Sequence, residues 1–173
     1  MKINPQARIP LRSEQGSVLL ISIILILALI IVTLGMFNLG STQTKIATNS
    51  ADSQIAFQTA EGALAQAEAN ILAGNFTTSS FAAGQAGLYI FNPANAPLWT
   101  TVDWSSSGAV MSSFTGNSRT ASAVIIEFLP PYIVPGQSQN SQRQTFAYRI
   151  TARAVGASGG SPVVLQSTVQ VQQ

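Results

Sequence analysis

The chain has 173 residues, enough for one domain with an extended segment but not for several independent domains. Only 8% of the residues are charged, and residues 17–173 carry five positive and five negative side chains, so the clustered cations that nucleic-acid binding requires are missing. There is no cysteine and no histidine, which excludes disulfides, the usual zinc sites and Ser-His or Cys-His catalytic pairs.

A long uncharged segment follows a short basic stretch. Residues 18–34 read VLLISIILILALIIVTL, in which 14 of 17 residues are Val, Leu or Ile. With Met36 and Phe37 the run covers about 20 residues, which at ~1.5 Å per residue is enough for a helix to cross a ~30 Å hydrocarbon core. A buried strand would end after about 4 to 8 residues. We therefore expect a membrane helix, the alternative being a buried helix of a soluble core.

The placement of charges predicts the orientation of this helix. Lys2, Arg8 and Arg12 precede the apolar run, whereas the first cation after it is Lys45. Basic residues stay on the cytoplasmic side, so we expect the remainder of the chain to be exported. The apolar core of a secretory signal peptide has only about 7 to 15 residues. We therefore favour a retained single-pass anchor over a cleaved signal.

The helix is expected to continue beyond the membrane, because no proline occurs between Pro10 and Pro93. Gly74 and Asn75 predict its C-terminal end. Past the membrane, apolar residues recur at steps of three and four, as on one face of an amphipathic helix. These residues are Phe57, Ala60, Leu64, Ala67 and Ile71.

Two glycines, Gly35 and Gly40, lie between the apolar and the amphipathic parts of the helix. Each costs about 1 kcal/mol relative to alanine in a helix interior. They could form a hinge, but we favour close packing or simple tolerance, since glycine is common in membrane helices. The predicted organisation has four parts: a leader at 1–16, a membrane half of the helix at 17–40, an amphipathic half at 41–74, and an exported domain at 75–173.

The exported domain contains β-prone runs separated by small polar residues. Two runs, 145–155 and 162–171, alternate polar and apolar residues and are joined by GASGGS at 156–161, which predicts a hairpin of half-buried antiparallel strands. The other expected strands are 88–91, 99–104 and 121–129, and the expected loops are 76–87, 105–118 and 130–144. The fold class predicted is α+β, with one dry face of an antiparallel sheet covered by the amphipathic helix.

The carboxylates form no catalytic constellation. Glu61 and Glu68 are seven positions apart and could share a helix face, but the chain offers them no histidine or cysteine partner. Asp52, Asp103 and Glu127 are isolated in sequence, and no loop has the carboxylate density of a calcium site. We interpret all five as solvated or interface groups. The chain is therefore predicted not to be an enzyme and to need no cofactor.

The N-terminal pattern resembles that of type IV pilins: a basic leader ending in Gly16, a cleavage site before Ser17, an uncharged span and a continuous amphipathic helix. Three segments resemble the PilX group of minor pilins, and AFQTAEGAL within the second is the most specific part. They are GSVLLISIILILALIIVTLG at 16–35, NSADSQIAFQTAEGALAQAEANI at 49–71 and YRITARAVGASGGSPVVLQSTVQV at 148–171. The resemblance implies a type IV pilin-like fold, in which the long helix packs on the C-terminal sheet.

The resemblance also implies processing and partners. A prepilin peptidase would cut after Gly16, the new Ser17 amine would be N-methylated, and the helix would pack with those of other minor and major pilins. Pilins of this family usually carry glutamate at the fifth mature position, where this chain has Ile21. That glutamate is thought to meet the N-terminal amine of the subunit ahead, because a carboxylate in lipid needs a partner.

A subunit without this glutamate gains nothing from a neighbour above it, so the resemblance implies a place at the pilus tip or in the initiating minor-pilin complex. Such a protein would sit in the bacterial inner membrane with its C-terminal domain in the periplasm, pass into the pilus, and support twitching, adhesion or DNA uptake. Two alternatives remain open: a type II secretion pseudopilin, and a single-pass anchored binding domain unrelated to pili.

Overall fold

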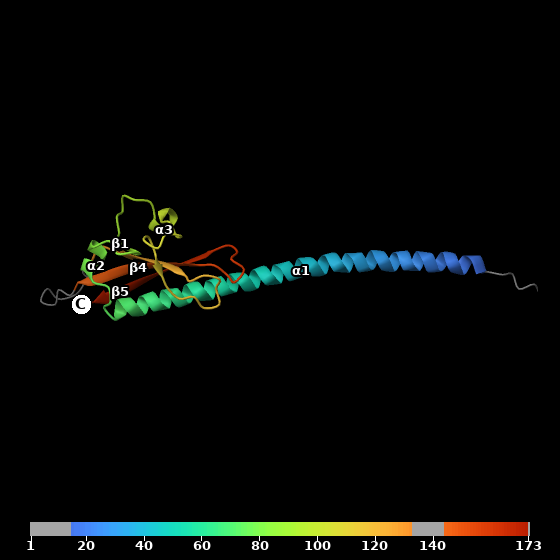
Figure 1. Ribbon diagram of the computed structural model, residues 1–173, viewed down its shortest axis with the longest axis horizontal. Coiled ribbons are helices and arrows are strands. Elements are labelled where there is room, and N and C mark those ends of the chain that lie inside the picture. The colour runs from blue at the N-terminus through green and yellow to red at the C-terminus, as the bar shows by residue number, and fades with distance from the viewer. Residues whose placement is uncertain (1–14, 133–143, 173) are drawn as a thin grey trace, which may run out of the picture. The chain divides into compact units, whose positions relative to one another are not determined.

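The computed structural model describes residues 15–132 and 144–172, whose elements are traced in Figure 1. The chain divides into two compact units, residues 1–46 and residues 47–173. The first helix, α1, contributes to both units, and all other elements belong to the second. The elements are α1 (Gln15–Leu72), α2 (Thr78–Ala82), β1 (Leu88–Ile90), α3 (Leu98–Thr101), β2 (Met111–Ser112), β3 (Ala123–Phe128), β4 (Thr145–Ala154) and β5 (Val163–Gln172).

Helix α1 ends where the sequence predicts. Gly74 has a φ of 73°, a left-handed conformation that glycine adopts without a Cβ penalty. Its N–H donates to the Ile71 carbonyl at 3.0 Å, and the Asn75 N–H donates to the Asn70 carbonyl at 3.0 Å. This pair of bonds is the Schellman arrangement, which satisfies carbonyls that the last helical turn would leave without partners.

The strands form one mixed sheet in the order β1-β3-β4-β5, with β2 paired to β3. β4 and β5 are antiparallel from the pair Thr145↔Gln172 to the pair Ala154↔Val163, which confirms the predicted hairpin around residues 156–161. β3 and β4 are also antiparallel, whereas β1 runs parallel to β3. The α+β class predicted from the sequence is therefore the class observed.

Three local predictions for the exported domain were wrong or incomplete. Residues 99–104 do not form a strand, because α3 starts there after Pro97, and the Thr100 and Thr101 hydroxyls donate to the Pro97 and Leu98 carbonyls at 2.6 and 3.3 Å. Helix α2 lies within the expected loop 76–87, and β2 lies within the expected loop 105–118. Most of the expected loop 130–144 falls outside the described residues.

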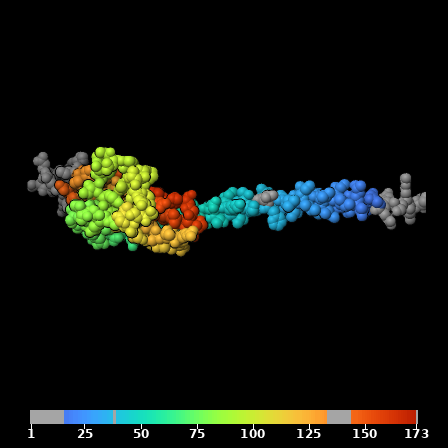
Figure 2. Space-filling view, turned by 45° about the horizontal axis from the view of Figure 1, so that its top comes forward, coloured from blue at the N-terminus to red at the C-terminus, as the bar shows by residue number. Residues whose placement is uncertain are grey.

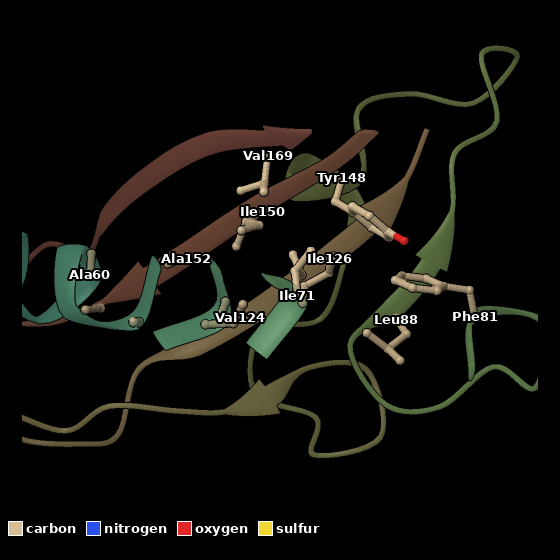
Figure 3. Packing of buried hydrophobic residues seen from close by; sticks show 13 residues of the cluster. Ala60, Ile71, Phe81, Leu88, Val124, Ile126, Tyr148, Ile150, Ala152 and Val169 are labelled. Carbon is tan, nitrogen blue, oxygen red and sulfur yellow. The ribbon is translucent and has the colours of Figure 1, made fainter. Parts of the chain in front are cut away.

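The core forms where the second half of α1 packs on one face of the sheet (Figure 3). The helix contributes mainly alanines, which lack bulk and so let its backbone approach the strands closely. The buried helix residues are Ala56, Thr59, Ala60, Ala63, Ala67 and Ile71. The predicted stripe was therefore right at its C-terminal end but wrong at Phe57, which is 45% exposed while its neighbour Ala56 is buried.

The opposite face of the sheet is covered as well, so the prediction of a single dry face was wrong. Ile125 and Thr151 point to this face and are almost fully buried. The cover is the connection between β1 and β2, where α3 lies (Figure 1). The Tyr89 hydroxyl donates to the Ala109 carbonyl at 2.7 Å, and the Arg153 guanidinium lies 6.0 Å from the centre of the Trp104 ring.

Gly62 marks the point where the segment before β3 crosses α1. A Cβ at this position would lie 2.6 Å from Phe114 Cδ1, so the aromatic ring rests directly on the helix backbone. The Ser113 hydroxyl donates to the Gln66 side-chain oxygen at 2.7 Å one turn further along. The glycine in AFQTAEGAL is Gly62. It has no side chain to occupy the space that the Phe114 ring fills.

Gly62→Ala is expected to destabilise the second unit by about 1 to 3 kcal/mol, because the added methyl group overpacks the Phe114 contact. In a Phe114→Ala background the same change should instead stabilise the protein by up to about 1 kcal/mol, through the higher helix propensity of alanine. Urea unfolding followed by tryptophan fluorescence measures both effects. Equal effects in the two backgrounds would show that the ring does not set the requirement for glycine.

Candidate functional site: the exposed apolar half of the helix

The large apolar side chains in the first unit are exposed along α1. Figure 2 shows one side of this stretch in blue. From Val18 to Phe37, each large apolar residue whose exposure is described is between 49% and 75% exposed. Burying such a side chain fully is worth about 1.5 to 3 kcal/mol. A surface of this extent and composition is stable only when lipid or other apolar helices cover it.

The polar side chains in this stretch are satisfied by the helix itself. The Ser22 hydroxyl donates to the Leu19 carbonyl at 2.8 Å, and the Thr33 hydroxyl donates to the Leu29 carbonyl at 2.7 Å. The Thr44 hydroxyl bonds to the Gly40 carbonyl in the same way at 2.9 Å. Hydrocarbon offers no hydrogen bonds, so a helix that enters it must satisfy its polar groups internally. Both hydroxyls between residues 18 and 37 meet this condition.

Among the described residues, one helix is long and apolar enough to cross a membrane, judged by length and composition. Its best window has a mean hydropathy of 3.2, and none of that window is buried. The core helix of a soluble domain would be largely buried, so that alternative does not fit. An apolar helix with its side chains exposed fits a membrane-anchored protein.

The residues predicted to be processed lie at the start of α1. Gly16 is the second residue of the helix, and a Cβ built on it would meet no atom of residues 15–132 or 144–172 within 4 Å. Ser17 and Ile21 are exposed. Gly35 and Gly40 are helical and also have open space around them, so close packing at either glycine would require a helix from another molecule.

The carboxylates are spread over the second unit and play different parts. Glu61 and Glu68 are exposed on α1, and Asp103 accepts hydrogen bonds from the Ser105 hydroxyl and N–H at 2.6 and 2.9 Å. Glu127 is buried, so of the two roles expected for these carboxylates, solvated or interface, the solvated one does not apply to it. No cluster of three or more metal-ligating side chains occurs within residues 15–132 and 144–172.

Asp52 joins α1 to the β4–β5 hairpin. Its carboxylate accepts a hydrogen bond from the Ser158 N–H at 2.7 Å, and a Cβ on Gly156 would overlap it. These contacts hold the pKa of Asp52 below its ordinary value, chiefly through the Ser158 backbone N–H and then through the Ser158 hydroxyl. Gly156 in the hairpin loop therefore leaves the space that the Asp52 carboxylate of α1 occupies.

We expect Asp52 to make this hairpin contact sensitive to acid. A lowered folded-state pKa means that the contact stabilises the fold above the unfolded-state pKa, about 3.9, and that this contribution is lost as the pH falls through the folded-state value. Between pH 7 and pH 3 the wild type should therefore lose more stability than Asp52→Asn, measured as urea midpoints. Glu61→Gln removes an exposed carboxylate and is the control. An identical loss in wild type and Asp52→Asn would contradict the role of Asp52.

Two features of the second unit escaped the sequence analysis. One is the Gly62–Phe114 contact, which joins positions far apart in the chain and leaves no local signal. The other is the pair formed by Glu127 and Arg149, whose atoms Oε2 and Nη1 are 3.6 Å apart. The alternation of side chains along each strand places both charges on the face opposite the core. A sequence analysis that had paired β3 with β4 would therefore have predicted that Glu127 and Arg149 lie together.

Comparison with known proteins identifies the family of the second unit. The family described as "Type IV pilus assembly protein PilX C-term" matches residues 46–171, most of the chain and nearly the whole of the second unit. No curated protein and no solved structure matches this chain. A sheet domain that carries an exposed apolar helix is suited to assembly with other subunits, and the chain belongs to the PilX family of type IV pilus assembly proteins.

Proposed function

We propose that this protein, whose family acts in type IV pilus assembly, is a minor pilin that helps to prime the pilus at or near its tip. The observation that carries the proposal is the exposed apolar surface of residues 18–37. Its hydroxyls are bonded within the helix, so the same surface suits lipid before assembly and neighbouring pilin helices afterwards. Moving between these environments would leave no polar group without a partner. The proposed role is structural rather than enzymatic.

The proposal includes processing by a prepilin peptidase after Gly16 and N-methylation of Ser17. It places the second unit in the periplasm, where the family's sheet domain would meet other pilins. The test is mass spectrometry of the protein purified from the inner membrane. We expect the N-terminal peptide to begin at Ser17 and to carry one methyl group. Protein that retains Met1 would contradict the proposal.

The partners recovered with the protein test the pilus role itself. Crosslinking in cells that assemble pili, followed by purification, should recover minor and major pilins through the helix of residues 17–40. Recovery of type II secretion pseudopilins instead would reassign the protein to that system. A deletion strain with normal piliation would contradict the priming role.

The place at the tip rests on Ile21, where most pilins carry glutamate. Ile21→Glu should raise the amount of this protein within the pilus shaft, because the new carboxylate could pair with the N-terminal amine of the subunit ahead. Quantitative immunoblotting of sheared pili against whole cells measures the shift. Ile24→Glu adds the same charge to another exposed position of the helix and should not produce it. Equal incorporation of wild type and Ile21→Glu would count against the tip argument.

A further inference from the structure

A cavity of about 550 Å³ lies on the face of the sheet opposite the helix-packed core. Three residues in cross-strand register form its floor: Tyr89 of β1 pairs with Glu127 of β3, which pairs with Arg149 of β4. The connection from Phe91 to Leu98 forms its rim. Binding sites for small molecules usually have volumes of about 300 to 1,000 Å³, so this cavity has the size of a ligand site.

Glu127 is the unusual residue of the floor. Its side chain is only 6% exposed, and the distance from its Oε2 to Arg149 Nη1 is 3.6 Å, longer than a hydrogen bond. In the part of the chain that the structure describes, Arg149 is its only partner. Within the described residues, the side-chain oxygen that is fully buried without a partner belongs to Thr145, so the Glu127 oxygens keep some access to solvent. A ligand in the cavity can therefore donate hydrogen bonds to them in place of water.

Arg149 is held in place for such a ligand. Its guanidinium carbon lies 5.1 Å from the centre of the Phe91 ring, close enough for a cation–π contact. The side chain is 30% exposed, so its N–H groups can still reach a molecule in the cavity. The floor therefore offers one charged acceptor and one charged donor side by side, with a net charge of zero.

The rim adds the remaining chemistry. Asn92, Asn95 and Thr101 provide amide and hydroxyl groups, while Pro93, Pro97 and Leu98 provide apolar surface. This lining favours a ligand without net charge that both donates and accepts several hydrogen bonds and has an apolar face. Sugars have these properties, because their hydroxyls point outward from a ring whose C–H groups form an apolar face.

We propose that this cavity, defined by Tyr89, Glu127, Arg149 and the 91–98 rim, binds a neutral saccharide. Glu127 accepts hydrogen bonds from ring hydroxyls, Arg149 donates to sugar oxygens, and the prolines of the rim contact the C–H face. This binding uses none of the residues of the apolar helix, so it does not compete with packing through that helix. The protein could thus recognise a glycan from within a pilus.

The test is binding of neutral mono- and disaccharides of glucose, galactose, mannose and N-acetylglucosamine to the full chain. The protein should be kept in lauryldimethylamine oxide micelles, because maltoside detergents carry a sugar headgroup that would compete. Saturation-transfer NMR identifies the bound sugar, and fluorescence of the nearby Trp99 and Trp104 gives its Kd. We expect at least one neutral sugar to bind and to show saturation on its ring C–H protons.

Substitutions inside and outside the cavity test whether the sugar binds there. Glu127→Gln should weaken binding about tenfold to a hundredfold, because a charged acceptor is replaced by a neutral one. Glu68→Gln makes the same change on an exposed part of α1 and should leave the Kd unchanged. Asn95→Ala alters only the exposed rim, so it tests the site even if Glu127→Gln fails to fold.

Three results would overturn the proposal. The first is the absence of binding across the neutral panel, and the second is equal binding by wild type, Glu127→Gln and Asn95→Ala. The third is a preference for an acidic sugar such as sialic acid, because the ligand would then recognise Arg149 rather than the neutral pair. None of these results depends on cleavage after Gly16, so the saccharide site and the pilin role can fail independently.

Discussion

Gly16→Phe is expected to leave the protein in the membrane at its unprocessed mass, with no detectable form that begins at Ser17. A peptidase that cuts beside Gly16 must bring its catalytic groups close to the backbone, and a glycine offers no side chain to prevent this. A Cβ at Gly16 would meet no atom within 4 Å among the residues that the structure describes. The substitution should therefore affect recognition by the peptidase and leave the fold intact.

Gly40→Phe is the matched control, because it places the same side chain at another open glycine of α1. It should be processed normally, whatever its effect on packing with other subunits. Pulse-labelled cells analysed by immunoblotting and mass spectrometry distinguish the two forms. A mature form of Gly16→Phe beginning at Ser17 would show that glycine is not required, and one beginning elsewhere would show that another site is cut.

Ile150→Ala is expected to lower the free energy of unfolding of the second unit by about 2 to 5 kcal/mol. Ile150 is completely buried in the middle of β4 and belongs to the core cluster that includes Ala60, Val124 and Ile126 (Figure 3). Truncation removes apolar contacts and leaves a cavity that rigid strands cannot close. Domains are stable by only about 5 to 15 kcal/mol, so this single change removes a large share.

The control for Ile150→Ala is Ile90→Ala, the same change at a residue of β1 that is 60% exposed. It should cost no more than about 0.5 kcal/mol, as is usual for surface positions. Urea unfolding of the full chain, followed by the fluorescence of Trp99 and Trp104, reports both. Similar costs at the two positions would mean that β4 is not the centre of the core.

These two variants separate the functions of the two units. The Gly16 variant should keep a folded sheet domain but fail to mature, whereas the Ile150 variant should mature but lose its fold at lower urea. Apolar surface is exposed in the first unit, where we propose that it serves assembly, and buried in the second, where it stabilises the fold. A loss of pili in both variants would then have two different causes.

The sequence alone determined the features that depend on neighbours in the chain. Fourteen Val, Leu or Ile residues among 17 specify an apolar helix without any tertiary contact. Gly74 and Asn75 specify the end of α1, because only glycine enters the left-handed conformation cheaply. The small residues at 156–161 and the alternation on either side of them specify the β4–β5 hairpin. Each of these outcomes follows from local backbone conformation or from hydropathy.

Only the tertiary structure decided which surfaces meet. It selected Ala56 over Phe57 for the core, because the sheet fixes which line of helix residues lies against it. It buried Glu127 beside Arg149 and set Phe114 on Gly62, through contacts between positions distant in the chain. The physical reason is that a single sequence records the preference of each residue for burial, whereas the partner that buries it is chosen when the strands pair and the helix docks.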